Sequence, residues 1–308
     1  MRVFVSGATG VIGRRVIPLL VQSGHAVTAM GRSNAKRAVL ARSGAKAVDT
    51  DMFDRGALRR ALDGHEAVIN LATHMPSSST RMLLRWSWRE NDRLRREGAA
   101  ALVDAALAAG VGRFIQESFA PVYEDGGDRW LSEDWPQRPV AYNRTVLDAE
   151  SAALRFSASG GAGVVLRFAA FYGGDSRVLH EMVEMIRKGW APLPGARSAY
   201  ISSISHDDAA AAVVAALNVS AGIYNVTDDE PVTRGEWLDS LADTLEVRRP
   251  KPLPAWLVGL GGSLTELLGR SLRISNAKLG GATAWAPIWP SIRDGWRALA
   301  PELRSQAP

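Results

Sequence analysis

Apolar and polar positions follow two different patterns along the first half of the chain. Short, nearly continuous apolar runs predict strands, whereas apolar residues spaced three or four positions apart predict amphipathic helices. The predicted strands are 2–6, 26–30, 46–50, 67–72, 113–118 and 163–168. The predicted helices between them are 11–24, 34–44, 54–64, 81–109 and 141–159. Strands that alternate with helices and are apolar on both faces predict an α/β protein with a doubly wound parallel sheet.

The pattern becomes less regular in the second half. Two further helices and one strand are expected at 177–189, 206–218 and 222–227. Thr233 and Glu236 have the spacing of a capping box, which predicts that a helix begins there. Pro, Gly and Trp are frequent in 247–308, and we find no internal repeat. A smaller, less regular C-terminal region is therefore expected beside the sheet.

Composition narrows the class of protein without indicating a function. The 308 residues are 46% hydrophobic and 22% charged, as in one large globular domain or two closely associated ones. The chain has no cysteine, which excludes disulfides, thiolate metal sites and a cysteine nucleophile and fits a cytoplasmic location. The start lacks a secretory leader pattern, and glycines interrupt the apolar stretch 253–269, so we expect no membrane contact. We attribute the net charge of +5 to solvated helix faces rather than to a nucleic-acid surface.

A glycine-rich turn lies between the first predicted strand and the first predicted helix. In SGATGVIG, residues 6–13, the glycines Gly7, Gly10 and Gly13 are spaced three apart. Gly7 permits a tight turn, Gly10 lets a pyrophosphate approach the backbone, and Gly13 lets helix and strand pack closely. The free N–H groups of the helix start favour an anion. We therefore predict a dinucleotide site, and the other residues of the turn expected there are Thr9, Val11 and Ile12.

The end of the second predicted strand indicates which dinucleotide binds. NAD sites usually carry Asp or Glu there, as an acceptor for the ribose 2′-hydroxyl. This chain has Arg32 and Ser33 instead, followed by Arg37. A guanidinium can pair with a 2′-phosphate in two-point geometry, so NADP(H) is favoured over NAD(H). The competing interpretation of Arg32 is an ordinary surface arginine near a helix start.

The ends of the later strands supply the rest of the predicted cofactor site, because ligands bind at the carboxyl edge of a parallel sheet. The residues expected there are Asp51, Met52, Leu71, Ala72, Thr73 and Phe168. The carboxylate of Asp51 would accept a hydrogen bond from the adenine amino group, and Met52 would lie against the adenine ring. Small residues after the fourth strand would let the cofactor backbone pass.

Through the glycine-rich turn and several further motifs, the chain resembles the short-chain dehydrogenase/reductase superfamily in its extended or atypical branch. This branch includes NAD-dependent epimerase/dehydratase-like proteins. The motifs are SGATGVIG, DTDMFD (49–54), AVINLA (67–72), AALAAGVGRFIQES (105–118), VVLRFAAFYG (164–173), SHDDAA (205–210) and IYNVTDDEPVT (223–233). The resemblance implies a Rossmann-type NADP(H)-binding domain over 1–170, to which 205–226 returns. It implies a substrate-binding region formed by 171–204 and 227–308, and a homodimer.

The resemblance also implies a catalytic set of a hydroxyl residue, a tyrosine and a lysine, of which this chain keeps only part. Tyr142 matches the tyrosine, which acts as the acid or base and also contacts the cofactor. Val146 stands where the lysine is expected, the residue that lowers the tyrosine pKa and holds the nicotinamide ribose. The hydroxyl residue is displaced, because counting back from Tyr123 gives Phe119, and the candidate Ser118 precedes it. A one-residue shift along a strand reverses the side chain, so it stays open whether Ser118 reaches the site.

The altered set restricts the chemistry. A tyrosine without a lysine neighbour keeps a pKa of about 10, which makes it a poor base and leaves it neutral as an acid. The sequence therefore favours an NADPH-dependent reductase of a carbonyl or enone, with Tyr142 as proton donor. The alternatives are a non-catalytic NADP(H)-binding redox sensor or regulator, and a nucleotide-sugar epimerase or dehydratase, which needs the missing base.

Aromatic residues suggest what kind of substrate such a reductase would take. Trp130 and Trp135 lie in the long segment 120–140, and Trp190 follows a predicted helix. If they line the site, the substrate is a small hydrophobic or aromatic molecule, although core packing is the ordinary role of a tryptophan. His74 follows the fourth strand, and no group of His, Asp and Glu has metal-ligand spacing, so no metal is expected.

Overall fold

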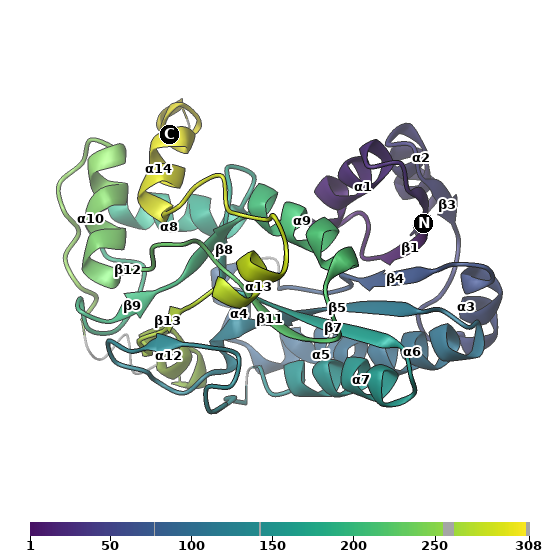
Figure 1. Cartoon of the computed structure of the whole chain (residues 1–308). Coiled ribbons are helices and arrows are strands. Elements are labelled where there is room, and N and C mark those ends of the chain that lie inside the picture. The colour runs from purple at the N-terminus through teal and green to yellow at the C-terminus, as the bar shows by residue number, and fades with distance from the viewer. Residues whose placement is uncertain (77, 142, 255–261, 306–308) are drawn as a thin grey trace.

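The computed structural model describes residues 1–76, 78–141, 143–254 and 262–305 (Figure 1). These residues form a seven-stranded parallel sheet with the strand order β11-β7-β5-β4-β1-β2-β3. The strands in that order are Gly222–Val226, Ala162–Phe168, Arg113–Phe119, Ala67–Asn70, Arg2–Ser6, Ala26–Met30 and Lys46–Val48. Helices flank the sheet, which confirms the α/β, Rossmann-type doubly wound fold expected from the sequence.

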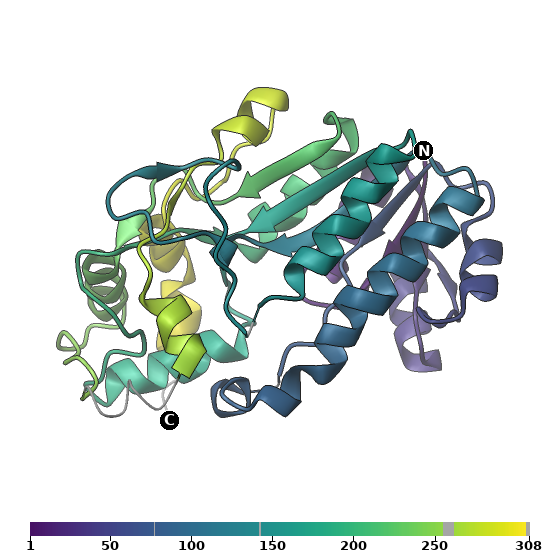
Figure 2. The ribbon, with the colours of Figure 1, turned by 90° about the horizontal axis from the view of Figure 1, so that it is seen from below.

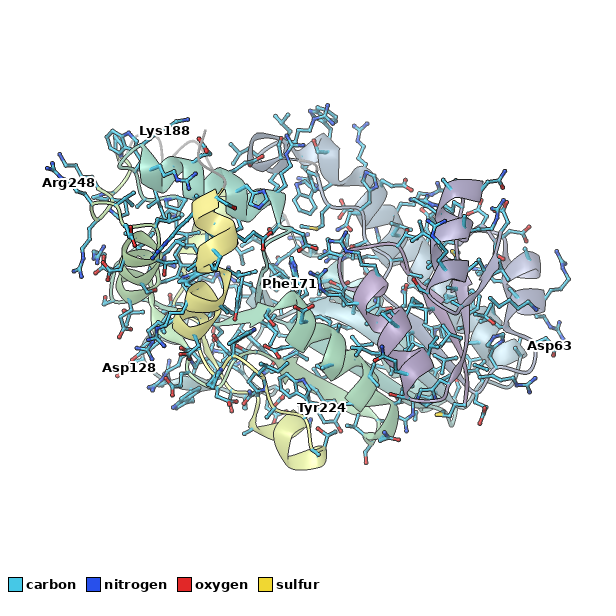
Figure 3. The ribbon with its side chains drawn as sticks, turned by 90° about the horizontal axis from the view of Figure 1, so that it is seen from above. Asp63, Asp128, Phe171, Lys188, Tyr224 and Arg248 are labelled. Carbon is cyan, nitrogen blue, oxygen red and sulfur yellow. The ribbon has the colours of Figure 1, made fainter. Side chains whose placement is uncertain are left out.

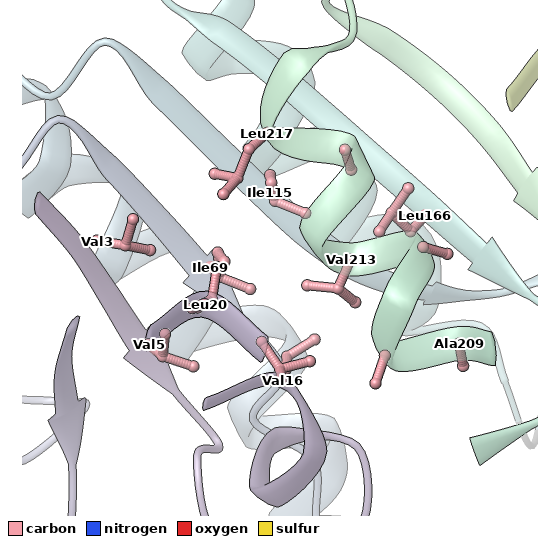
Figure 4. Close-up of a cluster of buried hydrophobic side chains, with 14 of the residues drawn as sticks. Val3, Val5, Val16, Leu20, Ile69, Ile115, Leu166, Ala209, Val213 and Leu217 are labelled. Carbon is pink, nitrogen blue, oxygen red and sulfur yellow. The ribbon is translucent and has the colours of Figure 1, made fainter. Parts of the chain in front are cut away.

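Two apolar cores explain why the strands are apolar on both faces. On one face, the strands pack against α1 (Gly13–Gln22), α2 (Asn34–Arg42) and α9 (His206–Ala215). Figure 4 shows part of this core, where Val5 and Ile69 of the sheet meet Val16 and Val213 of the helices. On the other face lie α3 (Arg55–Leu62), α6 (Ala99–Ala108) and α7 (Val146–Ala158), of which α6 and α7 run side by side in Figure 2. The sheet is therefore the middle of three layers.

The strand order reverses between β4 and β1. The chain passes from β3 across the sheet to β4, so the loops after β1 and β4 diverge on opposite faces. In open α/β sheets a ligand binds in the crevice that forms at this point, outside the carboxyl ends of the strands. The glycine turn follows β1, and Leu71–His74 follows β4, so both lie at this crevice.

Most of the remaining elements follow β7 in the chain and form the C-terminal region, which has its own apolar core, and one strand from earlier in the chain pairs with this region. Three two-stranded sheets pair β8 (Ala170–Tyr172) with β10 (Ser203–Ser205), β9 (Tyr200–Ile201) with β12 (Val232–Thr233), and β6 (Trp130–Leu131) with β13 (Arg273–Ile274). The helices are α8 (Arg177–Arg187), α10 (Arg234–Thr244), α12 (Gly262–Gly269), α13 (Ala277–Ala282) and α14 (Ile292–Ser305). The predicted capping box at Thr233 and Glu236 is present at the start of α10. Within 205–226, α9 packs on α1 and β11 pairs with β7, so this segment lies with the main sheet.

Two predicted helices differ from the observed ones. The helix expected over 81–109 is divided into α4 (Ser79–Met82), the 3₁₀ turn η1 (Arg85–Trp88), α5 (Arg89–Arg93), the π turn η2 (Leu94–Gly98) and α6. At η2 the backbone packs closely on Met52, because a β-carbon at Gly98 would lie 2.9 Å from the Met52 Cγ atom. Such single π turns inside helices are frequent at functional sites.

The helix expected over 141–159 begins only at Val146. The buried Asn143 holds the preceding chain in a turn, since its side chain accepts a hydrogen bond from the Val140 N–H and donates one to the Pro121 carbonyl. Local hydrogen bonds from an asparagine side chain compete with helix formation. Tyr142 itself lies outside the described residues. None of the described helices combines the length and the apolar character that crossing a bilayer requires.

Candidate functional site

The glycine turn has little space for any other residue. Gly7 has a φ of +70°, and a β-carbon there would lie 2.3 Å from the backbone of Leu71. A β-carbon at Gly13 would lie 2.3 Å from the Gly7 carbonyl oxygen. At Gly10 the nearest atom would be that same oxygen at 3.2 Å, so the outer side of this residue is open. The turn therefore presents bare backbone at the start of α1, as a pyrophosphate site requires.

A cavity of about 240 Å³, which we call the nucleotide cavity, lies beside this turn. Its lining residues are Gly7, Thr9, Gly10, Met30, Arg32, Lys36, Asp51, Met52, Phe53, Leu71, Ala72, Thr73, His74 and Leu94. Nine of the residues expected at the cofactor from the sequence are among them. Lys36 adds a second cation beside Arg32, whereas Leu94 reaches the cavity through the π turn η2 and had no signal in the sequence.

Several residues expected at the cofactor do not line the nucleotide cavity. The Ser33 hydroxyl caps α2 by accepting the Lys36 N–H at 3.3 Å, and Arg37 pairs with Asp49 at 2.7 Å. Phe168 is fully buried in the core below the sheet edge, with its ring 5.3 Å from that of Phe171. The others outside the cavity lining are Val11, Ile12 and Gly13. Their backbone shapes the turn, while the side chain of Ile12 packs against the core.

The end of β2 carries a cation that is not paired with a carboxylate of the described residues. Arg32 is exposed and has no ion-pair partner among the described residues, because the neighbouring carboxylate of Asp49 pairs with Arg37. Lys36 is exposed on the same side of the cavity. No carboxylate lines the cavity beside Arg32, and the next acidic lining residue is Asp51.

An ion-pair cluster joins the glycine turn to the C-terminal region. Arg15 donates to the Val11 carbonyl at 3.0 Å and pairs with Asp175 at 2.9 Å and Asp207 at 2.6 Å. The Nδ1 atom of His206 lies 2.8 Å from Asp175. Burial, together with the charge of Arg15, lowers the pKa of His206 to about 4. His206 is therefore neutral at physiological pH, and it contacts the cluster through Asp175, which also pairs with Arg15.

A second cavity, of about 150 Å³, lies at the same sheet edge between β5, β8 and the C-terminal helices. We call it the apolar cavity. Its apolar lining includes Phe119, Ala170, Phe171, Leu179, Met182, Leu193, Trp237, Leu267, Leu272, Ile274, Ile292 and Trp296. In Figure 3, Phe171 lies between the helices of the sheet domain and those of the C-terminal region. An engineered cavity of about this volume takes up benzene, so the space suits one aromatic ring.

The tryptophans that line the apolar cavity are not those considered from the sequence. Trp130 and Trp190 are 48% and 42% exposed and line neither cavity. Trp135 packs against a small core cluster under the guanidinium of Arg129. Trp237 and Trp296 line the cavity instead, with their rings 5.3 Å apart. They come from α10 and α14, which only the tertiary structure brings to β8.

Of the predicted catalytic set, the structure describes positions 118 and 146 but not Tyr142. The side chain of Val146 is fully buried and belongs to an apolar cluster with Ala120, Val122 and Leu131. Ser118 is 1% exposed, and its hydroxyl donates to the Glu150 Oε1 atom at 2.5 Å. This bond holds the hydroxyl against α7, and Ser118 is not among the lining residues of either cavity.

Ser118 belongs to a buried polar network instead. Arg167 binds both oxygens of Glu150, at 2.8 Å and 2.6 Å, and donates to the Tyr123 hydroxyl at 2.9 Å. Tyr123 in turn donates to Asn225 at 2.6 Å. Burial lowers the pKa of Arg167, but the hydrogen bonds and charge of Glu150 outweigh this effect and raise it overall. The network ties β5, β7, β11 and α7 together and has a structural role.

Comparison with known proteins agrees with this geometry. The family model for NAD(P)H-binding proteins matches residues 7–219. A 3-diazoavenalumate denitrifying reductase from Streptomyces sp is 35% identical over 96% of this chain and 99% of its own length. A 4-hydroxy-2-methyl-3-oxo-4-farnesyl-3,4-dihydroquinoline-1-oxide ketoreductase from Stigmatella aurantiaca is 26% identical over all of this chain and 84% of its own length.

Solved structures show the same fold. The human epimerase family protein SDR39U1, crystallised with NADPH, aligns with a TM-score of 0.78 and 21% identity over 98% of this chain and 99% of its own. UDP-glucose 4-epimerase from Thermotoga maritima, crystallised with UDP-glucose, aligns with a TM-score of 0.76 and 18% identity over 99% of both chains.

Proposed function

Since this chain belongs to the NAD(P)H-binding family of the epimerase-like, atypical short-chain dehydrogenase/reductase group and is reductase-like, we propose that it is an NADPH-dependent reductase of a small aromatic substrate. One observation carries the proposal. A cavity that suits one aromatic ring opens at the same sheet edge as the nucleotide cavity. A nicotinamide bound across this edge would supply hydride to a molecule in the apolar cavity.

Preference for NADPH over NADH is the second part of the proposal. Arg32 and Lys36 line the cavity at the end of β2, where a 2′-phosphate would lie. The pairing of Arg37 with Asp49 supports this assignment, because it occupies that carboxylate and leaves Arg32 and Lys36 as the cations available to the phosphate. Two-point hydrogen bonding from a guanidinium would give the cofactor both affinity and orientation.

The apolar surroundings of Val146 support reduction as the direction of the reaction. Oxidation of an alcohol requires a base, and no lysine lies at this position to lower the pKa of a tyrosine so that it could act as that base. Reduction of a carbonyl or enone requires a proton donor, and a neutral tyrosine is one. We assign that role to Tyr142 as a hypothesis that stems from the family resemblance.

A diazo group is a second candidate for the reduced centre, because the relative from Streptomyces is a denitrifying reductase of a diazo compound. For an arenediazonium, the hydride pair forms the new C–H bond and the C–N bonding pair leaves with N₂. No proton is transferred in this step, so neither the lysine nor the tyrosine of the usual set is required. A chain that has lost the lysine is compatible with such chemistry.

The test separates an enzyme from a nucleotide sensor. NADPH and NADH are first titrated against the intrinsic tryptophan fluorescence, and NADPH consumption is then followed with aryl ketones, aryl enones and an arenediazonium. We expect NADPH to bind more tightly than NADH and to be consumed with at least one of these classes. Binding of NADPH without consumption across the whole panel would instead favour a redox sensor.

The variant Tyr142→Phe identifies which chemistry operates. If the substrate is a carbonyl or enone, the variant should lose about 10²-fold or more in kcat with an unchanged NADPH affinity, since positioned acids contribute about 10²–10⁴-fold. If the substrate is a diazo compound, its turnover should be nearly unchanged. Full carbonyl reduction by Tyr142→Phe would exclude Tyr142 as the donor.

A further inference from the structure

A buried arginine lies in the wall of the apolar cavity. Arg234, at the start of α10, is 1% exposed and lines the cavity, which also extends to Phe119 and Ala170 at the sheet edge. Its Nη1 atom donates to the Ala196 carbonyl at 2.9 Å, and its Nη2 atom donates to the Leu268 carbonyl at 2.6 Å. Its Nε–H is buried and has no hydrogen-bond partner among the described residues.

The charge of Arg234 is also unbalanced. No carboxylate of the described residues lies within ion-pair distance of it, and the residues outside that set, 77, 142, 255–261 and 306–308, include no Asp or Glu. Burial lowers the pKa of Arg234, and the charge of Asp125 opposes this effect only in part. A guanidinium stays protonated even under such conditions, so its burial without a counter-charge is costly.

The second arginine of the cavity wall is different. Arg270 donates to the carbonyls of Tyr123 and Arg138, at 2.9 Å and 2.7 Å, and pairs with Glu266 at 3.1 Å. Its charge and both of its terminal nitrogens therefore have partners within the protein. Arg234 is the described cavity residue that still has both a buried donor and an uncompensated charge.

The surroundings hold the Arg234 guanidinium in a fixed position. Gly195 has a φ of +100°, and a β-carbon there would lie 2.7 Å from the Arg234 Nη1 atom and 3.0 Å from the Gly269 Cα atom. The guanidinium is thus enclosed by the backbone at Gly195 and at the end of α12, in addition to its bonds with Ala196 and Leu268. A cation fixed in this way is already oriented for an anion that enters the cavity.

We propose that the substrate is an aromatic carboxylate whose carboxylate binds Arg234 at the far end of the apolar cavity. The inference rests on the proposed function, in which this cavity holds the group to be reduced. The ring would occupy the apolar space between Trp237, Trp296 and Leu272, with the reducible group toward the sheet edge. A carboxylate fits better than a larger phosphate ester, because the walls are mostly apolar and the space suits a single ring.

Matched pairs of small ligands test this inference. Cinnamate and benzoate are compared with cinnamamide and benzamide, which have nearly the same shape and no charge. Binding is measured by calorimetry and by quenching of tryptophan fluorescence, with NADP⁺ at saturation. We expect the wild-type protein to bind each acid about 10- to 100-fold more tightly than its amide, the range of a hydrogen bond to a charged group.

Two variants locate the preference. Arg234→Gln should weaken acid binding to the level of the amide, leaving amide and NADPH affinities within about twofold. Arg197→Gln is the matched control, because it removes a cation that contacts α10 through Asp239 and does not line the cavity, and it should keep the preference. Arg234→Lys keeps the charge but not the two-point geometry, so it should retain part of the preference and serves if Arg234→Gln does not fold.

Equal binding of acid and amide by the wild-type protein would overturn the inference, as would an acid preference that survives in Arg234→Gln. Neither result depends on turnover. A protein that prefers the acids and reduces none of the tested compounds would refute the proposed reductase and leave the carboxylate site standing. Reduction of neutral aromatic compounds without any preference for acids would refute the carboxylate site and leave the proposed reductase standing.

Discussion

Restoring the missing lysine by Val146→Lys is expected to destabilise the protein rather than to complete a catalytic set. The side chain of Val146 is fully buried among Ala120, Val122, Tyr123 and Leu131. The carboxylate one helical turn away, that of Glu150, already binds Arg167 through both oxygens. A lysine at this position would therefore place an ammonium in an apolar cluster without a free counter-ion.

The cost follows from the pKa of the introduced amine. Full burial lowers the pKa of a lysine by about 3–5 units from about 10.4, so the folded variant carries a largely neutral amine near pH 7. Removing the proton at pH 7 costs about 4 kcal/mol, at about 1.4 kcal/mol for each pH unit below the unfolded pKa. This is a large part of the stability of an ordinary domain, which is about 5–15 kcal/mol.

The assay is chemical denaturation of Val146→Lys and of Val146→Met, which has a side chain of similar length without the charge. Because the unfolded state binds more protons than the folded state between the two pKa values, the stability of Val146→Lys rises with pH over that range. The difference between the variants should fall from about 4 kcal/mol at pH 7 to about 1 kcal/mol at pH 10.

Equal stability of the two variants at pH 7 would refute this reasoning, because it would mean that the amine reaches water or the cofactor. Gain of alcohol oxidation by Val146→Lys would refute it in a second way. In that case position 146 would face the reacting atoms, and the single substitution would account for the lost chemistry.

Three further predictions concern the nucleotide site and a buried acid. Arg32→Ala should weaken NADPH binding about 10- to 100-fold in fluorescence titration with little effect on NADH, and an equal loss for both would show that Arg32 does not read the 2′-phosphate. Gly7→Ala should abolish nucleotide binding and lower the free energy of unfolding by at least about 2 kcal/mol, because the β-carbon would overlap the Leu71 backbone; normal binding of NADPH would contradict the observed turn. Burial raises the pKa of Asp228 to about 8, so its neutral form contributes stability that is complete below about pH 4 and is lost as the pH rises through about 8. In urea denaturation the wild type should therefore lose stability relative to Asp228→Asn between pH 5 and pH 8, by up to about 1.4 kcal/mol for each pH unit, and parallel profiles would rule the titration out.

Local patterns were sufficient to predict the sheet and the nucleotide turn. Strands buried on both faces are apolar at nearly every position, and β1 at Arg2–Ser6 and β2 at Ala26–Met30 match the predicted boundaries. Gly7 and Gly13 were predicted because each has a local steric reason, which the backbone distances show. The positive end of β2 was also visible, since Arg32 occupies a position defined by one strand and one helix.

The tertiary structure alone decided the surroundings of Ser118, Val146 and Arg234. Ser118 was a plausible catalytic hydroxyl by position, but its partner Glu150 comes from a helix 32 residues away. The helix of Val146 begins later than predicted, because Asn143 bonds to Pro121 rather than extending the helix. The sequence placed Arg234 directly after a helix-capping residue and did not indicate that it lines a cavity.

The difference has a physical cause. A sequence determines an element through interactions between near neighbours, so periodicity, glycine spacing and capping are readable along the chain. The apolar cavity is bounded by β5, β8, α10, α12 and α14, whose side chains meet only after the whole chain has folded. Those distant neighbours determine whether an arginine such as Arg234 is solvated or buried without a counter-charge. The sequence alone therefore did not indicate which substrate the cavity takes.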